Sequence, residues 1–168
     1  FEDPQQFCLP PGVPRLGAPA QIISLKDEPL VLLFYNGGFT RDAVRQVWTD
    51  GRNHNPTTVA SETWNGDAVG HWEGDTLVIE STGFTDASWL SKNAYIHGFN
   101  MKVTERITRT GNNMTWDVTV DDPDYFLQPW HLTPVSHTLV TDPTATLFDA
   151  LPCTDHDNEH TTSHTRSS

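Results

Sequence analysis

Short apolar runs separated by turn signals extend along most of this 168-residue chain. Leu30–Tyr35 is closed by Asn36-Gly37-Gly38, and Ala43–Thr49 ends at Asp50-Gly51. The twelve prolines oppose long helices, because proline breaks a helix interior. Such a dense alternation of short runs and turns is typical of strands joined by tight turns. We therefore expect an all-β domain.

Two hairpins are the clearest local predictions. The first consists of Ala68–Trp72, the turn Glu73-Gly74-Asp75 and Thr76–Ser81. The second joins Met101–Thr110 to Met114–Val120 through a Gly-Asn-Asn turn. The other expected strands are Gln21–Leu25, Leu30–Tyr35, Ala43–Thr49 and Pro129–Val140, the last with an edge or bulge at Pro134. The fold class that follows is a single antiparallel β-barrel or sandwich of about eight to nine strands.

Composition divides the chain into three parts. Residues 1–20 contain five prolines and are expected to form an extended N-terminal arm that lies on the domain. Residues 21–153 form the β-barrel domain, and residues 154–168 form a polar C-terminal tail with little to bury. Two longer connections are expected within the domain, a polar loop at Arg52–Thr63 and a segment at Phe84–Asn100.

The formal net charge of −12 limits the partners that this chain can have. A field of that sign repels phosphate backbones and anionic membranes, so we expect neither nucleic acid nor a membrane as a partner. We expect a disulfide between Cys8 and Cys153, with two free thiols as the alternative. A disulfide requires an oxidising compartment, which favours a secreted or periplasmic location.

The segment from Trp64 to Ile79 reads Trp-Asn-Gly-Asp-Ala-Val-Gly-His-Trp-Glu-Gly-Asp-Thr-Leu-Val-Ile. It resembles the Trp-x-Gly…Gly-x-Trp-Glu-Gly-Asp-Thr-Leu-Val signature of a group of secreted, mostly uncharacterised bacterial proteins. Further similar motifs are Cys8-Leu9-Pro10-Pro11-Gly12, Thr49-Asp50-Gly51-Arg52, His54, Trp89-Leu90, His97, Glu105-Arg106, Asp121-Asp122-Pro123 and Pro129-Trp130. The resemblance implies secretion but no particular activity. The Glu-Gly-Asp-Thr-Leu turn also looks like hairpins of lipocalin-like barrels, which implies a lipocalin-like (calycin) architecture.

Glu105 is the main candidate for acid–base chemistry. Alternation places it on the same strand face as Met101, Val103 and Ile107, so we expect it to be buried. Burial raises the pKa of a carboxyl group unless a cation pairs with it, and such a group can transfer protons near neutral pH. The alternative is a structural ion pair with an arginine such as Arg45.

Two more residues complete the predicted catalytic set of Glu105, His97 and Arg45. His97 lies just before the strand of Glu105 and could share proton transfer with it. Its alternative role is that of a loop histidine bonded to the backbone. Arg45 alternates with Ala43 and Val47, so it is also expected to point inward, where it could bind an anionic group or neutralise Glu105.

A second set of residues is predicted to bind a ligand: His54, Trp72, Trp116, Trp130 and His131. For Trp116, core packing is the alternative. No cofactor and no metal site is predicted. His156, His160 and His164 have helical spacing, but the Thr- and Ser-rich tail around them opposes a helix.

Three functions follow from these residues. We rank first a cofactor-free lyase or isomerase acting on a small molecule in a barrel pocket. Second is a secreted binding protein for a hydrophobic or glycan ligand, motivated by the tryptophans. Third is a structural subunit of an extracellular homo-oligomeric assembly, in which edge strands pair between copies.

Overall fold

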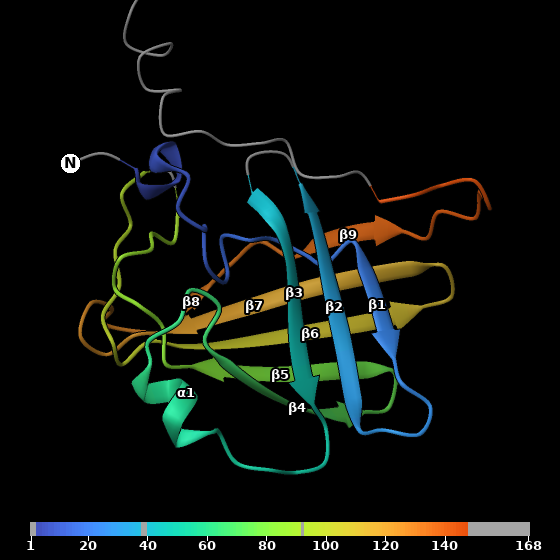
Figure 1. Ribbon diagram of the computed structural model, residues 1–168, viewed down its shortest axis with the longest axis horizontal. Helices are drawn as coiled ribbons and strands as arrows, with labels where there is room; N and C mark the ends of the chain where they lie inside the picture. Colours follow the sequence, from blue (N-terminus) through green and yellow to red (C-terminus); the bar gives the residue numbers. More distant parts are fainter. Residues whose placement is uncertain (1–2, 38–39, 92, 148–168) are drawn as a thin grey trace, which may run out of the picture.

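In the computed structural model the chain forms one curled β-sheet and almost no helix (Figure 1). The structure describes residues 3–37, 40–91 and 93–147. The elements within these ranges are η1 (Pro4–Phe7), β1 (Gln21–Ser24), β2 (Leu30–Gly37), β3 (Thr40–Trp48), α1 (Pro56–Ala60), β4 (Asp67–Glu73), β5 (Thr76–Thr82), β6 (Lys102–Thr110), β7 (Asn113–Asp121), β8 (Trp130–His131) and β9 (Val135–Thr138). The expected all-β class is confirmed.

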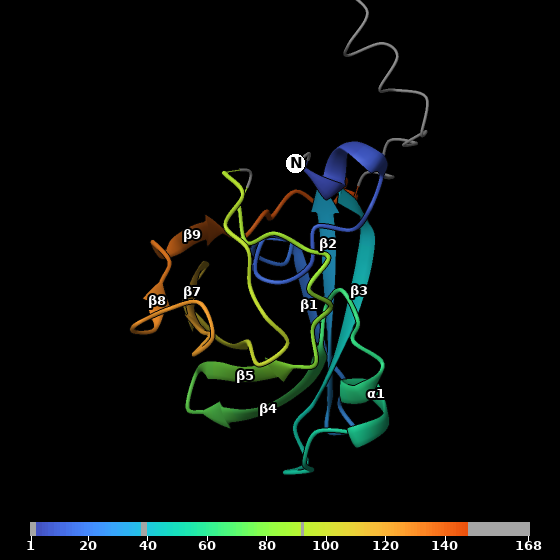
Figure 2. The ribbon, with the colours of Figure 1, turned by 90° about the vertical axis from the view of Figure 1, so that its left-hand side faces the viewer.

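The sheet runs in chain order from β1 to β8, and β9 also pairs with β7. Figure 2 shows its curvature: β1–β3 and β7–β9 form the two arms of a U, which β4 and β5 close at the bottom. The result is a half-barrel. Both expected hairpins are present, β4–β5 with Glu73 opposite Thr76 and β6–β7 with Thr110 opposite Asn113.

One pair departs from the expected antiparallel sheet. β3 and β4 run parallel, and their single register pair is Trp48 opposite Val69. Parallel neighbours need a crossover connection, which here is the segment between Trp48 and Asp67. The sequence predicted a polar loop in this region, whereas the structure has the short helix α1 within it. Asn55 caps α1 by accepting a hydrogen bond from the Thr57 backbone N–H, and Pro56 occupies its first turn.

The last strand is also shorter than expected. The sequence predicted one strand over Pro129–Val140, but the structure divides it into β8 and β9, which both pair with β7. Pro134 lies in the gap, where it has no N–H to donate to a ladder. The predicted irregularity at this proline is thus a complete break between two strands.

The concave side of the sheet is filled by side chains from both arms of the U. Trp89 and Leu90 of the long connection are buried as well. The core cluster consists of Val13, Val31, Leu33, Tyr35, Val47, Leu77, Ile79, Phe84, Leu90, Met101, Val103, Ile107, Trp116, Val118 and Val120.

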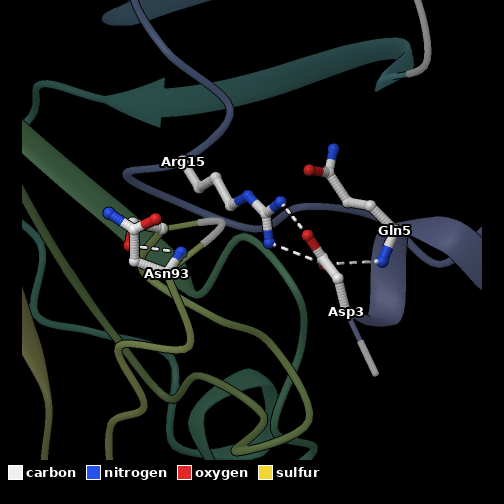
Figure 3. A network of polar contacts seen from close by, with 5 residues as sticks. Asp3, Gln5, Arg15 and Asn93 are labelled. Carbon is white, nitrogen blue, oxygen red and sulfur yellow. Dashed lines mark hydrogen bonds and ion pairs between the residues drawn. The ribbon is translucent and has the colours of Figure 1, made fainter. Parts of the chain in front are cut away.

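The N-terminal arm lies on the domain, as the sequence predicted. Val13 is part of the core, and its N–H donates to the Trp64 carbonyl. The start of the arm folds as η1 rather than remaining extended throughout. Asp3 accepts from the Gln5 N–H at the start of η1 and from the guanidinium of Arg15 (Figure 3). The arm is therefore held to itself by an ion pair and to the domain by Val13.

Gly70 provides a test of the packing around β4. A Cβ atom at this position would lie 2.8 Å from the Val78 carbonyl oxygen and 2.8 Å from Val47 Cγ1. We predict that Gly70→Ala lowers the free energy of unfolding by about 1–3 kcal/mol, because the backbone of β5 must shift. Urea unfolding followed by tryptophan fluorescence measures the change.

The matched control is Gly74→Asn in the turn after β4. Gly74 has a φ of +60° and no other atoms near the position of a Cβ. Asparagine tolerates this left-handed conformation better than most residues. Equal unfolding midpoints for Gly70→Ala and Gly74→Asn would contradict the packing described for β4.

Candidate functional site

A buried ion pair joins β3, in one arm of the sheet, to β6, the strand that pairs with β7 of the other arm. Arg45 on β3 and Glu105 on β6 are 4% and 0% exposed, and Arg45 Nη1 lies 2.7 Å from Glu105 Oε2. Neighbouring strands supply polar partners: Arg45 donates to the Tyr35 hydroxyl at 2.8 Å and to Ser81 Oγ at 2.9 Å. The indole N–H of Trp116 donates to Glu105 Oε1 at 3.0 Å. Glu105 therefore lies on the buried face, as predicted, and it pairs with Arg45, the partner of the alternative structural interpretation.

The charges of this cluster are fixed by their surroundings. Burial is the largest single influence on the pKa of Arg45 and lowers it. The charge of Glu105, the interaction with Tyr35 and the close polar contacts with both residues together outweigh burial, so the pKa of Arg45 is raised above its ordinary value. Burial also raises the pKa of the Tyr35 phenol, and the charge of Glu105 adds to this shift. Arg45 therefore stays protonated and Tyr35 stays neutral.

The pair is not fully satisfied by hydrogen bonds. Its distance is that of an ion pair, yet Glu105 Oε2 accepts no well-aligned hydrogen bond from the described residues. Arg45 Nε likewise donates none within the described part of the chain. Part of the desolvation cost of these charges is therefore offset by their mutual attraction alone.

His97, the third predicted catalytic residue, belongs to a different contact network. Its Nδ1 lies 3.0 Å from the Gly98 carbonyl and its Nε2 lies 2.8 Å from Ser88 Oγ. A carbonyl only accepts, so Nδ1 donates, and in the neutral ring Nε2 accepts the Ser88 hydroxyl proton. No motif in the sequence marks Ser88.

This network fastens the connection between β5 and β6. Ser88 and His97 are both buried, and the His97 ring packs edge-to-face on Phe84. The next residue, Gly98, donates its N–H to the buried carboxylate of Asp122 at 2.7 Å. Backbone bonding of a loop histidine, the alternative considered for His97, is therefore present.

An open cleft lies where β3 and β4 separate. Its volume is about 380 Å³. Beyond the single pairing of Trp48 with Val69, the two strands diverge, and the crossover segment forms the outer wall. The lining residues are Val44, Arg45, Gln46, Trp48, Arg52, Asn53, Asn55, Thr58, Asn65, Gly66, Asp67, Ala68 and Val69. The cleft thus combines an aromatic ring with many side chains that can make hydrogen bonds.

Contacts with Trp48 and Asp50 position Arg52 in this cleft. Its guanidinium carbon lies 3.8 Å from the centre of the Trp48 ring, within the range of a cation–π contact. Asp50 accepts from Arg52 Nε at 2.9 Å and from Nη2 at 2.6 Å. The hydrogen bonds from Arg52 hold the pKa of Asp50 below its ordinary value. Asp50 therefore stays ionised to a lower pH than an isolated aspartate does.

Asp67 organises the opposite side of the cleft. One of its oxygens lies 3.0 Å from His54 Nδ1 and accepts the Asn55 backbone N–H at 3.0 Å. The carboxylate thus fixes the ring of His54 and the start of α1 together. Arg52 and Asp67 were not among the predicted ligand-binding residues, although Arg52 follows the turn signal Asp50-Gly51.

The other predicted ligand-binding residues lie in different places. Trp72 is on the exposed surface of β4, and Trp116 is in the core. Trp130 and His131 line a second hollow of about 500 Å³ together with Tyr95, Phe126, Gln128 and Pro129. Among the five predicted ligand-binding residues, only Trp130 and His131 line a described hollow, while His54 lies next to the β3–β4 cleft.

The remaining sequence predictions concern metals and cysteines. No group of three or more metal-binding side chains occurs in residues 3–37, 40–91 and 93–147, and His156, His160 and His164 lie outside these ranges. Cys8 is buried, whereas Cys153 lies outside the described residues, so their bridge stays a prediction. In the described part of the chain no helix is long and apolar enough to cross a membrane.

Comparison of the chain with protein-family models, with curated proteins and with solved structures found no match.

Unfolding free energies test whether Arg45 and Glu105 are coupled. We predict that Glu105→Gln lowers the free energy of unfolding by about 3–5 kcal/mol, because it leaves the buried charge of Arg45 without a counterion. Glutamine keeps an acceptor for the Trp116 N–H. The double variant Arg45→Met/Glu105→Gln is expected to lose less than the sum of the single variants. Additive losses, or a stable Glu105→Gln variant, would show that the pair is not coupled.

Proposed function

We propose that the protein is a binding module that holds a glycan, or another ligand rich in hydroxyl groups, in the cleft between β3 and β4. The observation that carries this proposal is the lining of that cleft. Planar polar side chains surround it, namely Arg52, Asn53, Asn55, Asn65 and Asp67, beside the Trp48 ring. Neighbouring hydroxyl groups on a sugar ring match paired donors and acceptors of this kind.

Preorganisation supports the proposal. Trp48 and Asp50 already fix the guanidinium of Arg52, and Asp67 fixes His54 and the backbone at Asn55. A ligand that meets these groups loses little free energy in ordering them. The donors of Arg52 that do not bond to Asp50 are then available at a defined position.

The predicted acid–base chemistry has weaker support. Glu105 is 0% exposed and faces Arg45 and Trp116, so a substrate would have to displace both partners to reach its carboxylate. The two hollows described above are lined by other residues, apart from Arg45 at the edge of the cleft. A binding function therefore uses the accessible side chains of the cleft, whereas a lyase or isomerase would depend on the buried side chains of Glu105 and His97.

The setting that we propose for this binding module is outside the cytoplasm. The motifs around Trp64–Ile79 support membership of the secreted bacterial group, and Cys8 with Cys153 supports an oxidising compartment. The net charge of −12 supports the expected lack of nucleic-acid and membrane partners. Homo-oligomers remain compatible with this proposal.

Substitution of Arg52 tests the binding site. We would titrate ¹⁵N-labelled protein with a panel of neutral mono- and oligosaccharides and follow the side-chain amide signals of Asn53 and Asn65. We expect a saccharide of this panel to shift these signals. Arg52→Leu should weaken its binding by about tenfold or more, because hydrogen bonds to a charged donor are lost.

Arg106→Leu is the matched control. The side chains of Arg52 and Arg106 are 44% and 45% exposed, and each lies 2.6 Å from a carboxylate oxygen, of Asp50 and of Glu73. Arg106 does not line the cleft. Equal effects of the two substitutions, or no shift with any saccharide, would refute the proposed site.

Mass spectrometry tests the predicted disulfide between Cys8 and Cys153. We predict that the protein isolated without reductant has a mass lower by two hydrogen atoms than the reduced chain. Reduction should then lower stability, because a bridge between residues so far apart restricts the unfolded chain by roughly 4–5 kcal/mol in the chain-entropy model. An unchanged mass on reduction would show that Cys8 and Cys153 are not bridged to each other.

A further inference from the structure

The second hollow is built from aromatic residues of two connections. Tyr95 comes from the segment between β5 and β6, whereas Phe126 and Trp130 belong to the segment between β7 and the end of β8. Its volume of about 500 Å³ falls in the range of small-molecule pockets, roughly 300–1,000 Å³. None of its lining residues also lines the β3–β4 cleft.

The three rings meet at steep angles. Tyr95 and Trp130 have ring centres 5.9 Å apart and an interplanar angle of 86°. Phe126 and Trp130 have centres 6.2 Å apart and an angle of 59°. Rings arranged in this way form walls that face different directions, instead of a stack with one shared face. The faces of aromatic rings are electron-rich, so several walls around one hollow attract a positive charge.

The charges of the chain also favour a cationic ligand. No lysine or arginine lines the hollow, and its hydrogen-bonding side chains are Tyr95, Gln128, Trp130 and His131. β7 ends at Asp121, the turn after it carries Asp122 and Asp124, and the whole chain has a net charge of −12. The net negative charge of the chain therefore attracts cations and repels anions.

We propose that this hollow binds the quaternary ammonium group of a small, freely diffusing cation of the choline type. A trimethylammonium group spreads its charge over apolar methyl groups and needs no hydrogen-bond acceptors. A primary ammonium group is strongly hydrated and needs acceptors, of which this lining offers few. The aromatic walls supply the contact surface, and the acidic chain supplies the long-range attraction.

The test compares two ligands of the same shape. The full chain would be titrated with choline and with its neutral isostere 3,3-dimethyl-1-butanol, and the indole N–H signal of Trp130 would be followed by NMR. We expect choline to bind at least about fivefold more tightly than the isostere, because only choline gains the cation–π attraction. Equal affinities, or no shift with choline, would overturn the proposal.

Two tyrosines of similar exposure provide the matched variants. Tyr95 is 53% exposed and lines the hollow, whereas Tyr125 is 51% exposed and does not line it. Tyr95→Leu should weaken choline binding about fivefold, and Tyr125→Leu should leave it unchanged. Because both side chains are half exposed, neither variant is expected to prevent folding. Choline binding that is insensitive to Tyr95→Leu would place the cation elsewhere.

A last comparison identifies the source of the ammonium group. Phosphatidylcholine vesicles carry the same headgroup on a surface, so co-sedimentation of the protein with them is measured beside the choline titration. Binding of free choline without co-sedimentation supports a diffusing ligand. Co-sedimentation without binding of free choline would overturn the proposal in favour of a lipid surface.

Discussion

The ion pair between Arg45 and Glu105 is the contact on which the curled sheet most depends. It links β3 in one arm of the U to β6, which pairs with β7 of the other arm. Its partners Tyr35, Ser81 and Trp116 come from three further strands. Two charges inside a core are costly unless each faces the other, so a different register of these strands would leave both unpaired. We infer that the pair contributes less to net stability than to the choice of one arrangement of the strands.

The cleft results from the parallel arrangement of β3 and β4. A hairpin after β3 would have covered its edge, but β4 runs parallel to β3 and is reached by a crossover. The two strands touch near Trp48 and Val69 and then diverge, which leaves side chains of the crossover around an open space. Asn55 and Pro56 start α1 within this crossover, and Asp67 ties it to β4.

Local features of the fold could be predicted from the sequence, whereas the sites could not. The β4–β5 hairpin follows from a turn signal between two apolar runs, and the burial of Glu105 follows from alternation along one strand. Both predictions depend on patterns that extend over only a few consecutive residues. The contact of Asp67 with His54, and that of Tyr95 with Trp130, join residues far apart in the chain. One sequence by itself carries no information on which distant residues are in contact. At Pro134 the sequence predicted an irregularity but not a complete break, because proline signals an interruption of a strand but not its length.

The two hollows share a physical origin that explains why neither contains Glu105. Where strands pair continuously, their backbone groups are hydrogen-bonded and the side chains on the inner face are buried. The side chains that the sheet holds most firmly are therefore also the least accessible to a ligand. The cleft lies where the β3–β4 ladder stops, and the aromatic hollow lies beside β8, a strand of two residues next to the break at Pro134. Interruptions of the ladder thus expose side chains that the rigid core still holds in position. In this fold, recognition is therefore to be sought at the interruptions, while the buried ion pair fixes the frame that positions them.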